Sequence, residues 1–101
     1  MALDFHRLDN NEYLFGLDDT KYAHLEQLLI MFQQKTGINV DAYSDTILSI
    51  DHQKVILKLI DIWISDTDLN QDKPKIVTII WFKTWLDHFS NKGIDLKLLG
   101  D

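Results

Sequence analysis

The chain has 101 residues, 46% of them hydrophobic and 11% aromatic, which is enough to form a single domain, 1–101, around an apolar core. Sixteen acidic and ten basic side chains give a formal net charge of −6, and this sign argues against direct binding to nucleic-acid phosphates. Cysteine is absent, which excludes disulfide bonds and cysteine nucleophiles and favours the cytosol over a secreted location.

The first residues and the two most apolar stretches indicate where the chain resides. The start, MALDFHRLDNNEY, soon becomes polar and lacks the apolar run of a signal peptide. Stretches 55–64 and 76–86 are each about three helical turns long and contain charged residues, so they are too short to span a membrane. We therefore expect a cytoplasmic protein without membrane association, in which both stretches are buried helices.

The N-terminal segment alternates between apolar and polar residues on both sides of a turn-forming cluster at 9–11. Leu3 and Phe5 share one face of the first stretch, and Tyr13, Phe15 and Leu17 share one face of the second. This pattern predicts a β-hairpin.

A helix is expected next, over residues 19–36. Asp18 and Asp19 offer an N-cap and a negative charge at its start, and Gly37 with Ile38 provides a stop signal and a closing hydrophobic contact. Apolar residues recur at helical spacing and form one face: Tyr22, Leu25, Leu28, Leu29 and Phe32.

Residues 38–43 alternate again and fit either a short strand or an extended connector. Ser49 is an N-cap for a second helix that runs to about residue 65. Its polar residues form one narrow stripe, made of Lys54, Lys58, Asp61 and Ser65. Because most of its circumference is apolar, we expect this helix to be central and packed on two or more sides.

A polar, acidic loop follows at 65–72, and Asp72 is expected to cap a third helix with Pro74 in its first turn. The apolar face of this helix consists of Ile79, Phe82, Trp85, Leu86 and Phe89, and Gly93 ends it. The alternating tail at 94–98 fits a further strand beside the N-terminal hairpin. Together the elements predict an α+β domain, mostly α-helical, with three main helices and a small antiparallel sheet. An all-α bundle is the alternative.

The sequence contains no complete catalytic or metal-binding pattern. The chain has no nucleophile elbow, no glycine-rich phosphate loop and no pair of histidines at ligand spacing. Segment 41–52 begins like a calcium loop but has Thr46 where glycine is needed and His52 where the last glutamate is needed. We therefore expect no metal, no cofactor and no enzymatic activity. The remaining enzymatic alternative is acid–base chemistry by Asp41, Asp45 and His52, gathered near the start of the second helix.

Two groups of residues are candidates for contact with a protein partner. Tyr43 stands between Asp41 and Asp45, and an exposed aromatic between carboxylates suits a basic partner. Asp66 and Asp68 belong, with Asp72, to the acidic loop, and such a loop is more often a solvated face than a docking site. The predicted partner-binding residues are thus Asp41, Tyr43, Asp45, Asp66 and Asp68.

A family resemblance gives these candidates a context. The run KTGINVDAYSDT at 35–46, followed by Leu48-Ser49 and His52 and preceded by LDDTKY at 17–22, resembles small bacterial proteins encoded beside polymorphic toxins. These include the immunity proteins of contact-dependent growth-inhibition systems. The resemblance covers roughly residues 1–60, and its motifs are not catalytic.

The resemblance implies a stoichiometric inhibitor. Such a protein binds its cognate toxin domain, often a nuclease, as a one-to-one heterodimer in the cytosol and occludes the active site or the substrate channel. The acidic composition agrees, because a nuclease presents a basic cleft that an acidic surface can occupy. The free protein is then expected to be a monomer or a weak dimer. The alternative is an acidic regulatory or adaptor module that binds proteins without any toxin partner.

Overall fold

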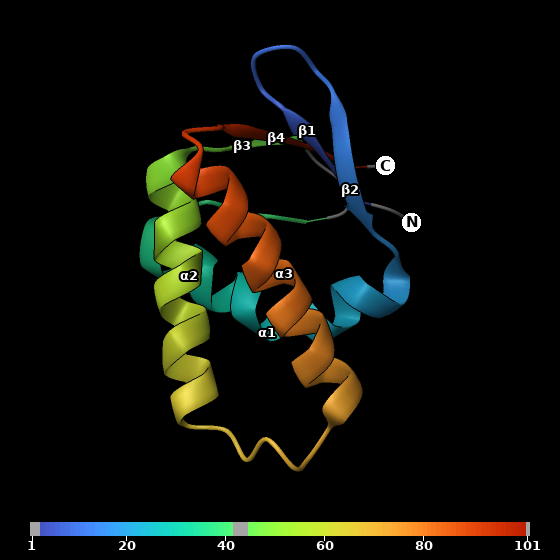
Figure 1. Cartoon of the computed structure of the whole chain (residues 1–101), viewed down its shortest axis with the longest axis vertical. Coiled ribbons are helices and arrows are strands. Elements are labelled where there is room, and N and C mark those ends of the chain that lie inside the picture. Colours follow the sequence, from blue (N-terminus) through green and yellow to red (C-terminus); the bar gives the residue numbers. More distant parts are fainter. Residues whose placement is uncertain (1–2, 42–44, 101) are drawn as a thin grey trace.

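Three helices pack against one face of a four-stranded sheet in the computed structural model, which describes residues 3–41 and 45–100 (Figure 1). The helices are α1 (Asp19–Thr36), α2 (Ile50–Ser65) and α3 (Lys73–Asn91). The strands are β1 (Leu3–Arg7), β2 (Tyr13–Leu17), β3 (Thr46–Leu48) and β4 (Leu96–Gly100). The predicted α+β class is confirmed, and the all-α bundle is excluded.

The sheet has the strand order β2-β1-β4-β3, and all neighbouring strands are antiparallel. Phe5 lies opposite Phe15 on one side and Leu98 on the other, so the predicted hairpin forms and the C-terminal tail joins it. Residues 38–41 belong to no strand, and residues 42–43 of the same predicted segment lie outside the described residues. The fourth strand is instead the short β3, which pairs with β4 and which the alternation did not indicate.

A β-bulge in the hairpin changes one predicted face. Phe5 pairs with Phe15 but His6 pairs with Tyr13, so Leu14 is an extra residue on β2. The extra residue turns Tyr13 to the solvent side of the sheet, where its ring meets His6 edge-on and 57% of its surface is exposed. The expectation that Tyr13 shares a face with Phe15 and Leu17 is therefore wrong.

Two of the three helices start with the side-chain capping hydrogen bond that the sequence predicts. Asp18 accepts a hydrogen bond from the Lys21 N–H at the start of α1, and Ser49 accepts one from the His52 N–H at the start of α2. Asp72 precedes α3, but its side chain makes no capping hydrogen bond. Its backbone is left-handed (φ 46°, ψ 56°), whereas a side-chain cap requires an extended residue, so the predicted cap at Asp72 is wrong.

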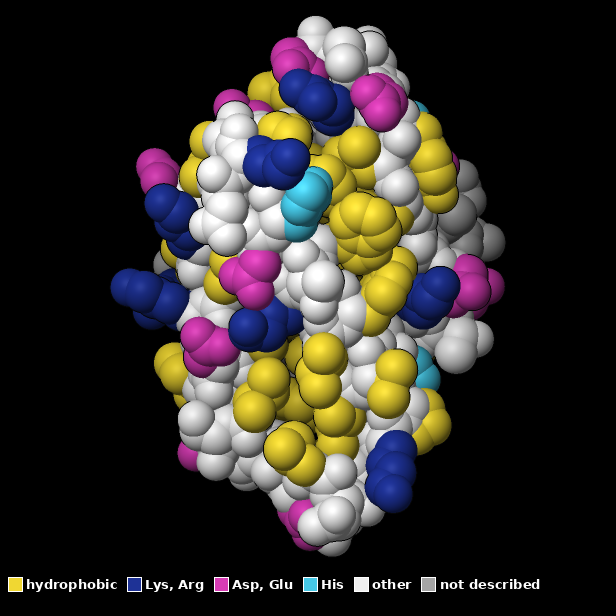
Figure 2. All heavy atoms as spheres, viewed as in Figure 1, with side chains coloured by type: hydrophobic (Ala, Val, Ile, Leu, Met, Phe, Trp, Pro, Cys, Tyr) yellow, Lys and Arg dark blue, Asp and Glu magenta, His cyan; other side chains and the backbone are white. Residues whose placement is uncertain are grey.

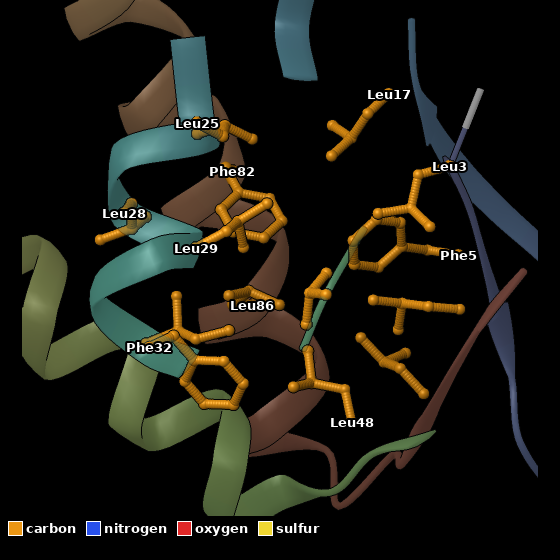
Figure 3. Close-up of a cluster of buried hydrophobic side chains, with 14 of the residues drawn as sticks. Leu3, Phe5, Leu17, Leu25, Leu28, Leu29, Phe32, Leu48, Phe82 and Leu86 are labelled. Atoms are coloured by element: carbon orange, nitrogen blue, oxygen red, sulfur yellow. The ribbon is translucent and has the colours of Figure 1, made fainter. Parts of the chain in front are cut away.

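The core lies between the inner face of the sheet and the helices α1 and α3. Figure 3 shows Leu3, Phe5 and Leu17 of the hairpin pointing toward α1 and α3. The helices contribute Leu25, Leu28, Leu29, Phe32, Phe82 and Leu86. At its centre, the ring of Phe5 stacks on Phe15 with centroids 4.3 Å apart and meets Phe82 edge-on. This packing holds the sheet and the helical layer together as one body.

The second helix packs largely as its composition predicts. It lies against both α1 and α3, and its buried apolar residues are Ile56, Leu59 and Ile60. The predicted polar stripe is exposed, at Lys54, Lys58, Asp61 and Ser65. Ile62, near the C-terminal end, is the exception among the apolar residues of α2, because it is 55% exposed.

Candidate partner-binding surface

The acidic residues of the loop between α2 and α3 lie at the end of the molecule farthest from the sheet (Figure 1). Asp66 ends α2, and its N–H donates to the Ile62 carbonyl at 3.2 Å. The Asp68 carboxylate accepts from the Asn70 N–H at 2.9 Å, which shapes the turn. Both residues are exposed, so their carboxylates are available to a partner.

Two further carboxylates extend this acidic end. Asp61, on the last turns of α2, and Asp72, just before α3, are also exposed. From Asp61 to Asp72 the chain contains four carboxylates and no lysine or arginine. We call these four residues, Asp61, Asp66, Asp68 and Asp72, the acidic rim. They form a local concentration of negative charge that is larger than the two carboxylates predicted from the sequence.

The other predicted partner-binding residues lie elsewhere. Asp45 is exposed just before β3, and its carboxylate accepts from the Gly100 N–H at 3.3 Å, so it belongs to the sheet region. Asp41 is half-buried and accepts from the Asn39 side-chain amide. Tyr43 lies outside the described residues. The structure thus separates Asp45 from Asp66 and Asp68, and the predicted set does not form one continuous surface.

The residues of the enzymatic alternative have separate structural partners. The His52 ring nitrogen Nδ1 is 3.1 Å from the Ser49 hydroxyl, and the ring meets Phe32 edge-on. Asp45 is engaged with the backbone of β4, as described above. Among residues 3–41 and 45–100, no three histidine or acidic side chains are grouped as metal ligands would be.

The outer face of the α2–α3 hairpin carries exposed apolar residues that the sequence did not single out. Val77 and Ile80 on α3 are 65% and 46% exposed, and Ile62 on α2 and Leu69 in the loop are also about half exposed. We call these four residues, Ile62, Leu69, Val77 and Ile80, the hairpin patch. Figure 2 shows hydrophobic side chains gathered on this face over the lower parts of α2 and α3.

The hairpin patch has a signal in the sequence that could have revealed it. On α3 the predicted core stripe contains Ile79 and Phe82, which are buried. Val77 and Ile80 stand three residues apart and each lies two residues before one of these core positions, on another side of the helix. A helix that is apolar on two sides needs a second surface to pack against, so this spacing indicates an interface on α3.

Comparison of the chain with protein-family models, with curated proteins and with solved structures found no match. Within the described part of the chain, no helix combines the length and the apolar character that crossing a membrane requires. The surface chemistry of the α2–α3 hairpin therefore provides the basis for a functional proposal.

Proposed function

We propose that this chain is a bacterial immunity protein, which binds a cognate toxin domain in the cytoplasm and neutralises it. The toxin domain is proposed to be a nuclease with a basic cleft, bound as a one-to-one heterodimer. The observation that carries this proposal is the acidic rim, with four exposed carboxylates at one end of the molecule. Its position beside exposed apolar residues is typical of a protein-binding surface.

The mechanism follows from the chemistry of a nuclease cleft. Such a cleft holds lysine and arginine side chains at the positions of nucleic-acid phosphates. The carboxylates of the acidic rim can accept hydrogen bonds from these groups in place of phosphates, and charge-assisted bonds are stronger than neutral ones. Bound in this way, the chain excludes the substrate by occupying its binding groups. It needs no catalytic residue, no metal and no cofactor of its own.

The negative charge also favours rapid capture. Opposite surface charges raise association rate constants from about 10⁵–10⁶ M⁻¹s⁻¹ to as much as about 10⁸–10⁹ M⁻¹s⁻¹ at low salt. Rapid association suits an inhibitor that must bind a toxin before nucleic acid is cut. The net charge of −6 and the four carboxylates of the acidic rim both contribute to this attraction.

Co-expression with the product of the adjacent upstream gene tests this function. We expect a one-to-one complex by size-exclusion chromatography with light scattering, and loss of the partner's nuclease activity at one molar equivalent. A partner that is not a toxin would favour the adaptor alternative. Absence of a complex, or a complex that retains full nuclease activity, would contradict the proposal.

A further inference from the structure

The hairpin patch is built from two antiparallel helices and their connection. Ile62 lies one turn before the end of α2, and Val77 lies about one turn after the start of α3, so the loop brings the two residues together. Ile80 continues the apolar line along α3, and Leu69 extends it into the loop. The four residues thus all belong to the loop end of the α2–α3 hairpin, over which Figure 2 shows hydrophobic side chains gathered on one face.

Two tryptophan rings, unlike the hairpin patch, are covered by lysine side chains of the same chain. The Lys21 ammonium lies 4.8 Å from the centroid of the Trp81 ring, and the Lys75 ammonium lies 5.7 Å from that of Trp63. The lysine stems and charges therefore shield these indoles within the chain itself. Val77, at 65%, is the most exposed of the large apolar residues that the structure describes. The hairpin patch lacks comparable cover.

The charges around the hairpin patch decide between a second copy of the chain and a different partner. The acidic rim contributes four carboxylates, and the nearest exposed basic residues on the same helices are Lys58 and Lys73. A symmetric dimer through this patch would bring together two molecules that each carry −6, and their overall repulsion opposes that association. A partner with basic residues around its own apolar group has the opposite, favourable arrangement.

We propose that the hairpin patch is the centre of the contact with the partner protein, whose matching surface has apolar side chains bordered by lysine and arginine. This inference rests on the proposed function, since the partner is taken to be the toxin domain. The two parts of the surface then have different roles. The acidic rim steers association and sets its salt dependence, whereas burial of Val77 and Ile80 sets the dissociation rate.

Substitution of one isoleucine in each of two helices tests this inference. Ile80 in the hairpin patch and Ile30 on α1 are both 46% exposed, so they form a matched pair. Serine has about the same helix propensity as isoleucine, and neither side chain is buried, so both variants should keep the wild-type unfolding midpoint. The probe is the catalytically inactive product of the adjacent upstream gene, with Kd measured by isothermal titration calorimetry.

We expect Ile80→Ser to raise Kd at least about thirty-fold, as for a residue at the centre of an interface, and Ile30→Ser to leave it unchanged. The double variant Val77→Ser/Ile80→Ser should weaken binding further. If the wild type binds and Ile80→Ser binds equally well, the inference is overturned while the proposed function stands. If the wild type does not bind, the proposed function itself fails.

Sedimentation velocity of the free chain at micromolar concentration tests whether a second copy of the chain covers the hairpin patch. We expect a monomer for the wild type and for Ile80→Ser. A wild-type dimer that Ile80→Ser converts to a monomer would assign the hairpin patch to a second copy of the chain and overturn the choice of a basic partner.

Discussion

The sheet and the far end of the α2–α3 hairpin use their apolar residues in different ways. The inner face of the sheet buries Leu3, Phe5, Phe15, Leu17, Leu48, Leu96 and Leu98, so these residues contribute to folding. The hairpin patch leaves Val77 and Ile80 in contact with water, where they contribute little to folding. The same residue types therefore stabilise the fold at one end and are available to a partner at the other.

The largest effect on stability is expected in the sheet. Phe5 is fully buried and packs against Phe15 and Phe82, so Phe5→Ala should lower the free energy of unfolding by about 3–5 kcal/mol. Urea denaturation followed by circular dichroism measures this change. Ile80→Ser, measured in the same way, should change stability by no more than about 0.5 kcal/mol. Equal losses for the two variants would remove the distinction between the two regions.

A buried glutamine offers a second test at the sheet side. The Gln53 side chain is fully buried, and its Nε2 donates to the carbonyls of Ile94 at 2.8 Å and Leu48 at 3.3 Å. Gln53→Leu leaves both carbonyls without this donor and should cost about 1–3 kcal/mol of stability. Partner binding should not change, because Gln53 lies near the sheet end of α2. Thermal unfolding together with calorimetric binding separates the two effects.

The acidic rim should affect association more than stability. Asp66→Asn/Asp68→Asn removes two negative charges, and Glu12→Gln/Glu26→Gln removes two from exposed positions elsewhere. We expect the first pair to lower the association rate constant several-fold more than the second at low salt. Stopped-flow measurements at increasing ionic strength should show the difference shrink as salt screens the charges. Identical rates for the two double variants would show that the acidic rim has no special role.

The smallest expected effect is in the turn between β1 and β2. Arg7 donates two hydrogen bonds to the Asp9 carboxylate, which lowers the pKa of Asp9 below its ordinary value. A carboxylate whose pKa is lower in the folded state than in the unfolded state stabilises the folded state at pH values above its unfolded-state pKa. This stabilisation is lost as the pH falls through its folded-state pKa. Both groups are solvent-exposed, so the effect should be small and weakened by salt.

An NMR titration of the Asp9 carboxyl carbon measures the shift directly. The midpoint should lie below the ordinary aspartate value and should rise toward it in Arg7→Gln. A midpoint that is the same in both proteins would show that the Arg7 contact does not form in solution.

The sequence predicted those elements whose signals are local. Asp18, Gly37 and Ser49 define helix ends through hydrogen bonds within a few residues, and these ends lie where they were expected. The bulge that exposes Tyr13 depends on the register between two strands, which alternation along one strand does not contain. Strand β3 has only three residues and exists because β4 pairs with it.

The candidate surface was predictable only in part. Asp66 and Asp68 stood out because the loop is acidic, and both are exposed. The spacing of Val77 and Ile80 marks a second apolar side of α3, but the hairpin patch was not predicted, because an apolar stripe does not show whether another element covers it. Only the folded structure, in which 65% of Val77 and 46% of Ile80 are exposed, shows that both residues face away from the core. The fold separates Asp45 from the α2–α3 loop, and the linear sequence does not predict this separation.

The most direct test of the account is hydrogen–deuterium exchange of the chain with and without the catalytically inactive product of the adjacent upstream gene. We expect binding to slow exchange in peptides covering residues 61–80 and to leave the sheet peptides at 3–17 and 96–100 unchanged. Protection confined to the sheet, with residues 61–80 exchanging at the same rate in both samples, would contradict it.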